Sequence, residues 1–212
     1  MTIGVAISTH ARPGLLARTL PNWAAHLGGV ATLAVIHDEA GDGVAATKNR
    51  CLAALMDAGC TELFLADDDV WPLADRWWQP YTTYTEPHLM HCWGKTRFIT
   101  YERDVSVWSW PRGCLLYVTR PVVEKVGGMR TEFGRWGGEH AEWSQRIHNA
   151  GFTSTPFCDA ITAKKGIWYC TDYTREVPSS VPSSVRDSEH NTRHRHQLYK
   201  QFKGSTHFVA FN

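Results

Sequence analysis

Three consecutive aspartates, Asp67-Asp68-Asp69, are the residues of this 212-residue chain whose type and spacing most directly indicate chemistry. Adjacent carboxylates repel one another, so they need a cation or surrounding hydrogen-bond donors to stay ionised together. They follow residues 62–66, an apolar run that predicts a buried strand, so Asp67 and Asp69 can point to one side of it. Such oxygen ligands suit Mg²⁺ or Mn²⁺ with a diphosphate completing the shell. The alternative is a solvated acidic turn, and the segment alone does not choose between them.

A second candidate segment is Trp136-Gly137-Gly138-Glu139, which leads into a predicted helix over residues 141–150. Its glycines allow the backbone to approach a ligand closely. Glu139 would lie near a helix N-terminus, where a carboxylate is also simply a favourable first-turn residue. The sequence therefore allows two interpretations of this segment: a loop that contacts a ligand, or simply the well-capped start of a helix.

The elements that must position these residues alternate along the first third of the chain. Apolar runs at 3–8, 31–36 and 62–66 predict buried strands, and helical spacing follows Pro13 and spans 44–58. Strand–helix–strand–helix–strand order is typical of a parallel α/β sheet, whose ligands bind beyond the carboxyl ends of the strands. Thr9, Asp38 and Asp67 follow those strand ends. Further on, we predict a helix over 73–84, short strands within 88–93, 97–101, 105–110 and 113–119, and a helix over 121–126.

Composition and charge narrow the class of protein. Hydrophobic residues make up 43% of the chain and its net charge is +1, which excludes a protein that grips nucleic acid or an anionic membrane over its whole surface. Neither an 18-residue apolar run nor a signal-peptide pattern is present, and six scattered cysteines form no C-x-x-C pair. We therefore expect a cytoplasmic protein with reduced, mostly buried thiols and no membrane span.

Taken together and in order, these segments resemble the metal-dependent nucleotide-sugar glycosyltransferases of the GT-A fold. Residues 3–13 and Thr47-Lys48-Asn49-Arg50 are similar to the family 2 type, and residues 64–70 match its DXD segment. Residues 113–142, with Gly127-Gly128-Met129 and the WGGE segment, resemble galactosyltransferases and polypeptide N-acetylgalactosaminyltransferases. The resemblance implies one α/β GT-A (Rossmann-like) domain: a mostly parallel central sheet flanked by helices, with a small β region on the acceptor side. Residues 1–175 would form this domain, completed by a loop, basic helix and tail over 176–212.

The resemblance also implies a role for each matching residue. Asp69 would bind Mn²⁺ or Mg²⁺ directly, and Asp67 would bind the donor ribose or share the metal. The nucleobase would lie against Asp38 and Thr9, and the diphosphate or donor sugar near Lys48. The donor-binding set further includes Arg12, Asp68, Trp136, Gly137 and Gly138.

Glu139 would contact sugar hydroxyls or act as the base, because the acceptor hydroxyl needs a positioned proton acceptor. Inverting relatives usually carry an aspartate directly after this glutamate, and here the residue is His140. Either residue could be the base, or the enzyme could be retaining and need none there. Relatives often add a late histidine to the metal shell, and we expect His190 to fill that place. The alternative is that His190 belongs to a solvated basic helix, since residues 186–203 carry a net charge of +3.

The expected function is transfer of one sugar from a nucleotide-diphosphate sugar, with UDP-sugars favoured, to a hydroxyl of a glycan, protein or modified nucleic acid. Two alternatives compete with it. A nucleotidyltransferase could share the fold and acidic site, but residues 8–14 lack the glycine-rich basic loop expected to hold a triphosphate. A sugar- or nucleotide-binding module could retain the fold without catalysis. The chain also contains ten tryptophans, which suggest an aromatic wall around the site. We expect this wall to consist of Trp136 in the site and of Trp71, Trp77 and Trp78 beside the acceptor. We expect three others to pack in the core: Trp23, Trp143 and Trp168.

Overall fold

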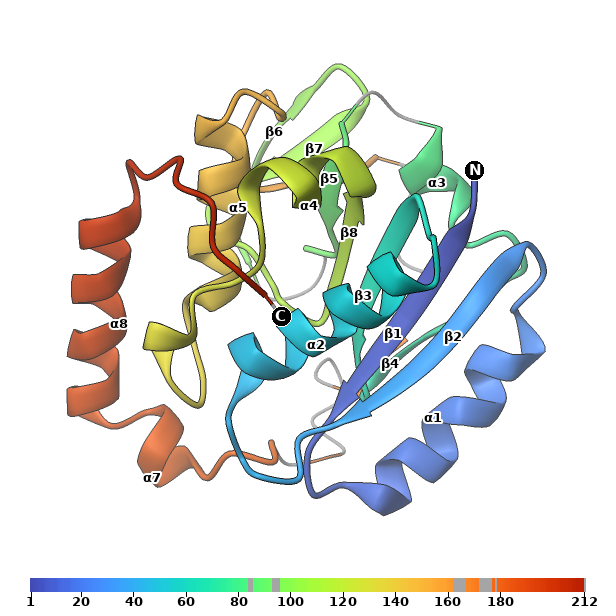
Figure 1. Cartoon of the computed structure of the whole chain (residues 1–212), viewed down its shortest axis with the longest axis horizontal. Helices are drawn as coiled ribbons and strands as arrows, with labels where there is room; N and C mark the ends of the chain where they lie inside the picture. The colour runs from blue at the N-terminus through green and yellow to red at the C-terminus, as the bar shows by residue number, and fades with distance from the viewer. Residues whose placement is uncertain (84–85, 93–95, 162–166, 172–176, 178, 212) are drawn as a thin grey trace.

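The computed structural model describes all residues except 84–85, 93–95, 162–166, 172–176, 178 and 212. Its central sheet has the strand order β2-β1-β3-β8-β5 (Figure 1). Strand β1 (Ile3–Thr9) pairs in parallel with β2 (Val30–His37) and β3 (Glu62–Asp67). Strand β8 (Leu115–Thr119) runs antiparallel to both β3 and β5 (His88–Met90). The predicted mostly parallel α/β sheet is confirmed, with β8 reversed.

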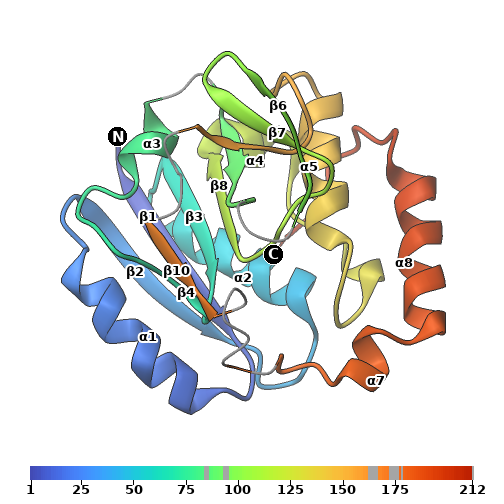
Figure 2. The same ribbon diagram turned by 180° about the vertical axis from the view of Figure 1, so that it is seen from behind.

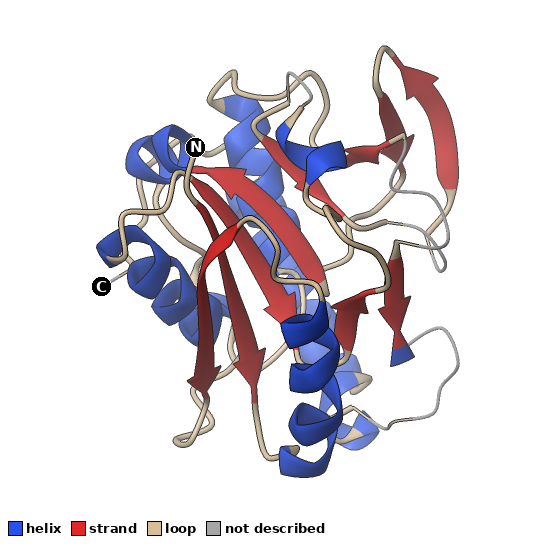
Figure 3. Cartoon of the chain, turned by 90° about the vertical axis from the view of Figure 1, so that its right-hand side faces the viewer, coloured by secondary structure: helices blue, strands red, loops and turns tan. Residues whose placement is uncertain are grey.

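Alternating side chains of the sheet build two separate layers of core. Val5 and Phe64 face an aromatic layer that includes Trp23 of helix α1 (Pro13–Ala25), whereas Ala6 and Leu65 face an aliphatic layer. The aliphatic layer is covered by α2 (Val44–Asp57), α4 (Arg120–Val126) and α5 (Glu139–Asn149). Helices therefore lie on both sides of the sheet (Figure 3), as the two-residue period of buried strands requires.

The parallel strands end level with one another. Thr9 pairs with His37 across β1 and β2, and Ser8 pairs with Asp67 across β1 and β3. Because the registers match, the residues that follow each strand emerge at the same edge. Thr9, Asp38 and Asp67–Asp69 are thereby brought to one side of the sheet by backbone pairing alone.

The second half of the chain adds smaller sheets. Strands β6 (Phe98–Glu102), β7 (Val105–Trp108) and β9 (Cys158–Ala160) form an antiparallel sheet, the predicted small β region. Strand β4 (Val70–Pro72), directly after the aspartates, pairs with β10 (Trp168–Cys170) on the α1 side of the sheet (Figure 2). This pairing brings the Thr171 amide to the Asp69 carbonyl, 3.0 Å away.

The predicted helix over 73–84 is wrong in extent, because the described helix α3 spans only Gln79–Thr82. Tertiary bonds hold the segment before it instead. The indole N–H groups of Trp77 and Trp78 donate to the His26 and Gly28 carbonyls, each at 3.0 Å. These bonds tie the segment to the end of α1 rather than to a helix of its own.

The C-terminal part contains the short 3₁₀ helix η1 (Thr131–Phe133), α7 (Ser183–Arg186) and α8 (Glu189–Phe202), and α8 packs beside η1 and α5. The tail then returns to the body, where Val209 bridges Gly127 (Figure 1). The expected boundary between residues 175 and 176 lies outside the described residues. All six cysteines are buried and free, as expected. No described helix is long and apolar enough to cross a membrane.

Candidate active site

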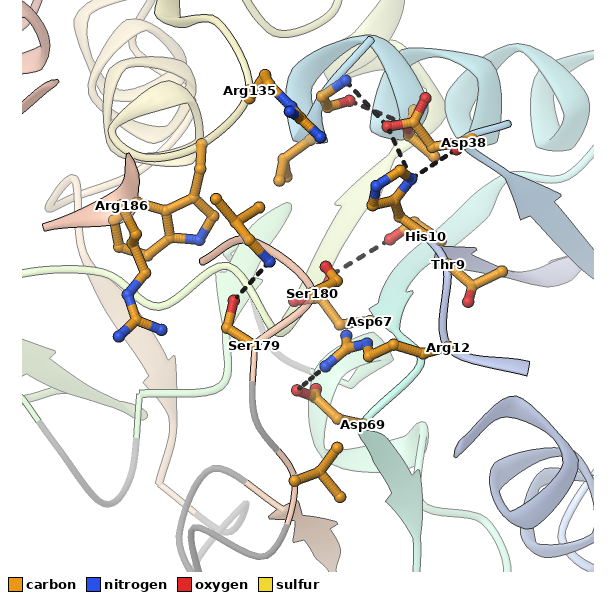
Figure 4. A pocket seen from close by; sticks show the side chains of 17 residues that line it. Thr9, His10, Arg12, Asp38, Asp67, Asp69, Arg135, Ser179, Ser180 and Arg186 are labelled. Carbon is orange, nitrogen blue, oxygen red and sulfur yellow. Dashed lines mark hydrogen bonds and ion pairs between the residues drawn. The ribbon is translucent and has the colours of Figure 1, made fainter. Parts of the chain in front are cut away.

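A cavity of about 370 Å³ lies at the carboxyl edge of the parallel strands (Figure 4). Its lining comes from six parts of the chain: the ends of β1, β2 and β3, the last of these with the aspartates, the start of α2, the loop before α5, and the segment that leads into α7 together with its last residue. The lining residues are Ser8, Thr9, His10, Arg12, Asp38, Gly43, Val44, Thr47, Asp67, Asp69, Arg135, Trp136, Val177, Ser179, Ser180, Val181 and Arg186. Six of the predicted site residues therefore meet in one cavity: Thr9, Arg12, Asp38, Asp67, Asp69 and Trp136.

Asp67 is paired from behind by a buried lysine. The Nζ atom of Lys48, which is 1% exposed, lies 2.7 Å from Oδ1 of Asp67, and the Ser8 hydroxyl donates to the same oxygen at 3.2 Å. Burial disfavours the ammonium, but the charge and hydrogen bond of Asp67, with smaller contributions from the Cys51 and Cys114 thiols, together outweigh burial and raise the pKa of Lys48. Lys48 is therefore charged and acts through Asp67, and it is not among the lining residues.

Asp68 differs from its neighbours because its carboxylate points into the protein. Its oxygens accept hydrogen bonds from the Thr9 hydroxyl at 2.6 Å and from the Arg12 guanidinium, and it is fully buried. Burial raises the pKa of Asp68, although the Arg12 charge and the Thr9 bond oppose this. The expectation that Asp68 contacts the donor finds no support in this placement, because the residue does not line the cavity.

Asp69 lies on the cavity wall beside Arg12. Its Oδ2 atom is 3.6 Å from Nη1 of Arg12, and its side chain is 12% exposed. Asp67 and Asp69 thus present carboxylate oxygens to the cavity while Asp68 anchors the loop. Two carboxylates completed by phosphate oxygens and water are what Mg²⁺ or Mn²⁺ takes in nucleotide sites, so the residues present fit a divalent metal.

Asp38 holds the backbone that leads into α2. Its oxygens accept the backbone amides of Asp42 at 2.8 Å and Gly43 at 3.0 Å, and Arg50 donates to it at 3.3 Å. Burial would raise the pKa of Asp38, but these amides outweigh it and the pKa is lowered. Nδ1 of His10 donates to the Asp38 carbonyl at 2.6 Å. An ionised, firmly held Asp38 therefore lines the cavity where the nucleobase was expected.

Glu139 and His140 form a hydrogen-bonded pair at the start of α5. His140 Nδ1 donates to Glu139 Oε1 at 2.9 Å, and the Gly137 amide donates to Oε2 at 2.8 Å. Burial opposes both charges, yet each side chain stabilises the other: the pKa of Glu139 is lowered and that of His140 is raised. The charge of Asp67 and a hydrogen bond to Pro111 also favour the imidazolium. Neither side chain lines the cavity.

The glycines of the WGGE segment adopt backbone angles that only glycine takes easily. Gly137 and Gly138 have φ angles of +102° and +99°, and Gly138 is the N-cap of α5. This bend turns Trp136 toward the cavity and Glu139 into the helix. Gly137 and Gly138 shape the loop and do not themselves line the cavity.

His190 is a correction to the expected metal shell. The described residues contain no group of three histidine, cysteine or acidic side chains placed to hold a metal ion. His190 lies exposed on the first turn of α8, and its ring stacks parallel to that of His194 with centroids 6.3 Å apart. His190 is not among the residues that line the cavity with the two aspartates.

The expected aromatic wall is also largely wrong. Trp71 and Trp77 are buried in the aromatic core, with exposures of 4% and 1%, and Trp78 packs at its edge. The expected core residues Trp23, Trp143 and Trp168 are indeed buried. Trp93 lies outside the described residues. Among the tryptophans that the structure describes, Trp136 lines the cavity, so the aromatic excess is mostly core.

Several lining residues were not anticipated from the sequence. Arg135 adjoins the WGGE segment, Ser179 and Ser180 belong to a stretch rich in Pro and Ser over residues 176–184, and Arg186 follows directly after it. That stretch reads as a linker because Pro and Ser disfavour regular structure. Of these residues, Arg135 could most easily have been predicted to line the cavity, because it directly precedes the WGGE segment. Nothing in the local sequence indicated that the later segment would fold back over the cavity.

Comparisons with known proteins agree with this architecture. The family model for the N-terminal domain of galactosyltransferase matches residues 102–167. No curated protein is significantly similar in sequence. Among solved structures, the catalytic domain of Drosophila β1,4-galactosyltransferase 7 with xylobiose shares 18% identity at a TM-score of 0.61, covering 97% of this chain and 82% of its own.

Two further structures are similar over different shares of their length. A Pyrobaculum calidifontis mannosyltransferase, solved with GDP-Man and Mn²⁺, shares 13% identity at a TM-score of 0.53, covering 96% of this chain and 72% of its own. GalNAc-T7, solved with UDP, GalNAc and Mn²⁺, shares 13% identity at a TM-score of 0.56, covering 76% of this chain and 42% of its own. At such identities the likeness establishes the fold. The chain therefore has the GT-A fold, and the match of residues 102–167 to the galactosyltransferase domain supports an enzyme of the glycosyltransferase class.

Proposed function

We propose that the chain transfers a single sugar from a nucleotide-diphosphate sugar, with UDP-sugars favoured, to an acceptor hydroxyl with the help of Mn²⁺ or Mg²⁺. One observation carries the proposal: Asp67 and Asp69 face the same cavity as Asp38 and Trp136, at the carboxyl edge of the parallel strands. Drosophila β1,4-galactosyltransferase 7 has also been solved, as a mutant, with manganese, UDP-Gal and xylobiose, which supports the choice of metal and donor class.

In this proposal different parts of the cavity bind different parts of the donor and the metal. Asp38 and Thr9 bind the nucleoside, and Asp67 and Asp69 hold the metal. Bound there, a divalent cation neutralises the charge that develops on the departing diphosphate. Lys48 pairs with Asp67 from behind and orients it, and Arg12 pairs in the same way with Asp68 and Asp69. Trp136 then contacts the donor sugar and acceptor at the other end of the cavity.

We assign the base to His140, with Glu139 as its positioning residue; because neither side chain lines the cavity, this assignment requires the acceptor hydroxyl to reach His140 beyond the cavity wall. Glu139 is held ionised with a lowered pKa, which makes it a weak proton acceptor. The 2.9 Å bond to Glu139 raises the pKa of His140, so its neutral form accepts a proton more readily. A retaining enzyme would need no base here, and the pH profile separates the two cases.

The first test is release of UDP or GDP from a panel of nucleotide sugars without acceptor. Slow release that requires Mn²⁺ or Mg²⁺, lost in Asp69→Asn and kept in Asp57→Asn, is expected. Asp57 is a matched control because it is exposed at the end of α2. No release across the panel would favour a non-catalytic binding module. Release of pyrophosphate from a nucleoside triphosphate in the presence of a sugar phosphate would favour a nucleotidyltransferase.

The second test is the pH dependence of transfer. With His140 as base, kcat/KM rises with pH through an apparent pKa above 6.5, because the imidazole must first lose its proton. Glu139→Gln removes the charge that raises this pKa, so the rise moves to lower pH. His140→Ala abolishes the rise. An unchanged profile in both variants would remove the pair from the proton transfer.

A further inference from the structure

The rim of the cavity opposite Asp38 carries two arginines around one indole ring. The guanidinium carbons of Arg186, at the end of α7, and Arg195, on α8, lie 5.7 and 5.3 Å from the centroid of the Trp136 ring. Trp136 and Arg186 both line the cavity, and Figure 4 shows Arg186 across it from Asp38 and Arg12. Nη1 of Arg195 lies against Gly137, 3.1 Å from the position a Cβ would occupy there.

The two ends of the cavity differ in how many acidic and basic side chains they carry and in how these are paired. At the strand ends every carboxylate is paired with a cation: Asp67 with Lys48, Asp68 and Asp69 with the same Arg12, and Asp38 with Arg50. At the Trp136 end, Asp187 is the carboxylate paired with Arg186, at 3.0 Å.

Arg195 adds a further guanidinium group at that end, whereas the guanidinium of Arg135 lies at the Asp38 end, 3.5 Å from the position a Cβ would occupy on Gly41. Nearby Glu189 is already paired with Arg193, and Glu139 with His140. The Trp136 end is therefore the positively charged end of the cavity.

From this arrangement we infer that the acceptor is a saccharide carrying a carboxylate or phosphate group close to the hydroxyl that receives the sugar. The inference rests on the proposed function, which places the acceptor at the Trp136 end. The indole offers a flat face to a sugar ring, and planar guanidinium groups at its edge match a carboxylate or phosphate in geometry as well as charge. A neutral acceptor would leave this excess of positive charge unused.

An anionic saccharide fits these residues better than a nucleic acid. The aromatic side chains of the basic helix α8 are committed to packing: the Tyr199 hydroxyl donates to Gln145 at 3.3 Å, and Arg130 covers the Phe202 ring at 4.0 Å. They are not free to stack on bases, which is what single-strand binding uses. A chain of net charge +1 also lacks the broad cationic surface that tracks a phosphate backbone.

The experiment compares transfer to acceptors that differ only in charge, using a donor already found by UDP or GDP release. Methyl glucoside is paired with methyl glucuronide and glucose with glucose 6-phosphate, with galactose and mannose analogues of each pair, and an oligonucleotide panel forms a further arm. We expect anionic members to exceed their neutral partners by about tenfold in kcat/KM at low salt, and the advantage to shrink with added salt. The carboxylate and phosphate arms show which anion is preferred.

Arginine variants test whether the preference arises at Trp136. In Arg195→Gln the ratio of kcat/KM for anionic over neutral acceptor falls by roughly fivefold, through KM rather than kcat, and Arg195→Lys retains most of it. The matched control is Arg193→Gln, an exposed arginine on the same helix. The ratio is internally normalised, so a general loss of activity does not mimic the effect.

The inference would be overturned by equal transfer to neutral and anionic partners, by a ratio that Arg195→Gln leaves unchanged, or by transfer to oligonucleotides alone. Absence of transfer to every anionic saccharide, while metal-dependent donor hydrolysis proceeds, would also overturn it and leave the proposed function standing. Absence of donor hydrolysis itself would instead count against the proposed function.

Discussion

The Nζ atom of Lys48, on a helix interior position that is 1% exposed, lies 2.7 Å from Oδ1 of Asp67 at the end of β3. An ammonium withdrawn from water is costly unless a carboxylate compensates it. The Asp67 side chain is one-third exposed and lines the cavity, so it lies between the buried Lys48 ammonium and the place where a ligand would bind. The aspartate segment is thus held from behind by the chain itself.

Removing the buried cation should destabilise the protein. Lys48→Met leaves Asp67 unpaired beside two other carboxylates, and we expect a loss of about 2 kcal/mol in the free energy of unfolding, less than for a fully buried pair because Asp67 is partly solvated. Denaturant unfolding measures the loss. In the double variant Lys48→Met/Asp67→Asn about half of it should return, because no unpaired charge remains. A double variant no more stable than Lys48→Met would contradict the pairing.

The three aspartates should separate into a structural one and two that face the ligand. Asp68→Ala leaves the Arg12 guanidinium without its buried partner and removes the acceptor of the Thr9 hydroxyl, so we expect a loss of about 3 kcal/mol in stability. Asp69→Asn should leave the free energy of unfolding within about 1 kcal/mol of the parent while abolishing metal-dependent donor hydrolysis. Thermal and denaturant unfolding of both variants, followed by the donor assay, would expose any reversal of these roles.

The Glu139–His140 pair predicts a pH dependence of stability. The pKa of His140 is raised in the folded state, so its contribution is complete below the unfolded value of about 6.5 and is lost as pH rises through the higher folded value. His140→Asn should therefore reduce stability more at pH 5.5 than at pH 9. Equal losses at both values of pH would show that the imidazolium does not contribute. The pKa of Glu139 is lowered, so its contribution disappears only in acid, below about pH 4.5.

Gly43 joins the start of α2 to the loop that carries Trp136. Its φ angle is +101°, and a Cβ there would lie 2.6 Å from the Arg135 Cα and the Gly134 carbonyl oxygen. Gly43→Ala must push this loop away, at a cost of about 2 kcal/mol, and should raise the KM for the donor. Gly14→Ala serves as the control, because nothing lies within 4 Å of its Cβ position. An unchanged donor KM in Gly43→Ala would show that the contact does not shape the cavity.

Much of the first half of the fold was predictable because its signals are local. The apolar runs of β1, β2 and β3 and the helical spacing of α2 follow the periods of regular structure, and no observed bound differs from the predicted one by more than one residue. Parallel pairing then fixes which strand ends meet. The meeting of Thr9, Asp38 and the aspartates in one cavity follows from those elements.

The predictions that failed depended on contacts between distant residues. The helix over 73–84 gave way to indole bonds between Trp77 and Trp78 and the end of α1, some fifty residues earlier in sequence. His190 has the chemistry of a metal ligand, but the packing of α8 against α5 and η1 decides where it lies. Residue type alone could not indicate that Trp71 and Trp77 belong to the core.

The sequence by itself determined the class of fold, the acidic segment and the WGGE loop, because strand and helix periodicity and motif order are written in consecutive residues. Only the tertiary structure decided how the three aspartates divide their roles. Asp68 turns inward because Arg12 and Thr9 meet it there, and Asp67 turns outward with Lys48 behind it. Only the tertiary structure, too, brought Arg186 and Arg195 to Trp136, fifty residues or more along the chain. Long-range charge pairing and stacking depend on which surfaces pack together, and no local pattern encodes them.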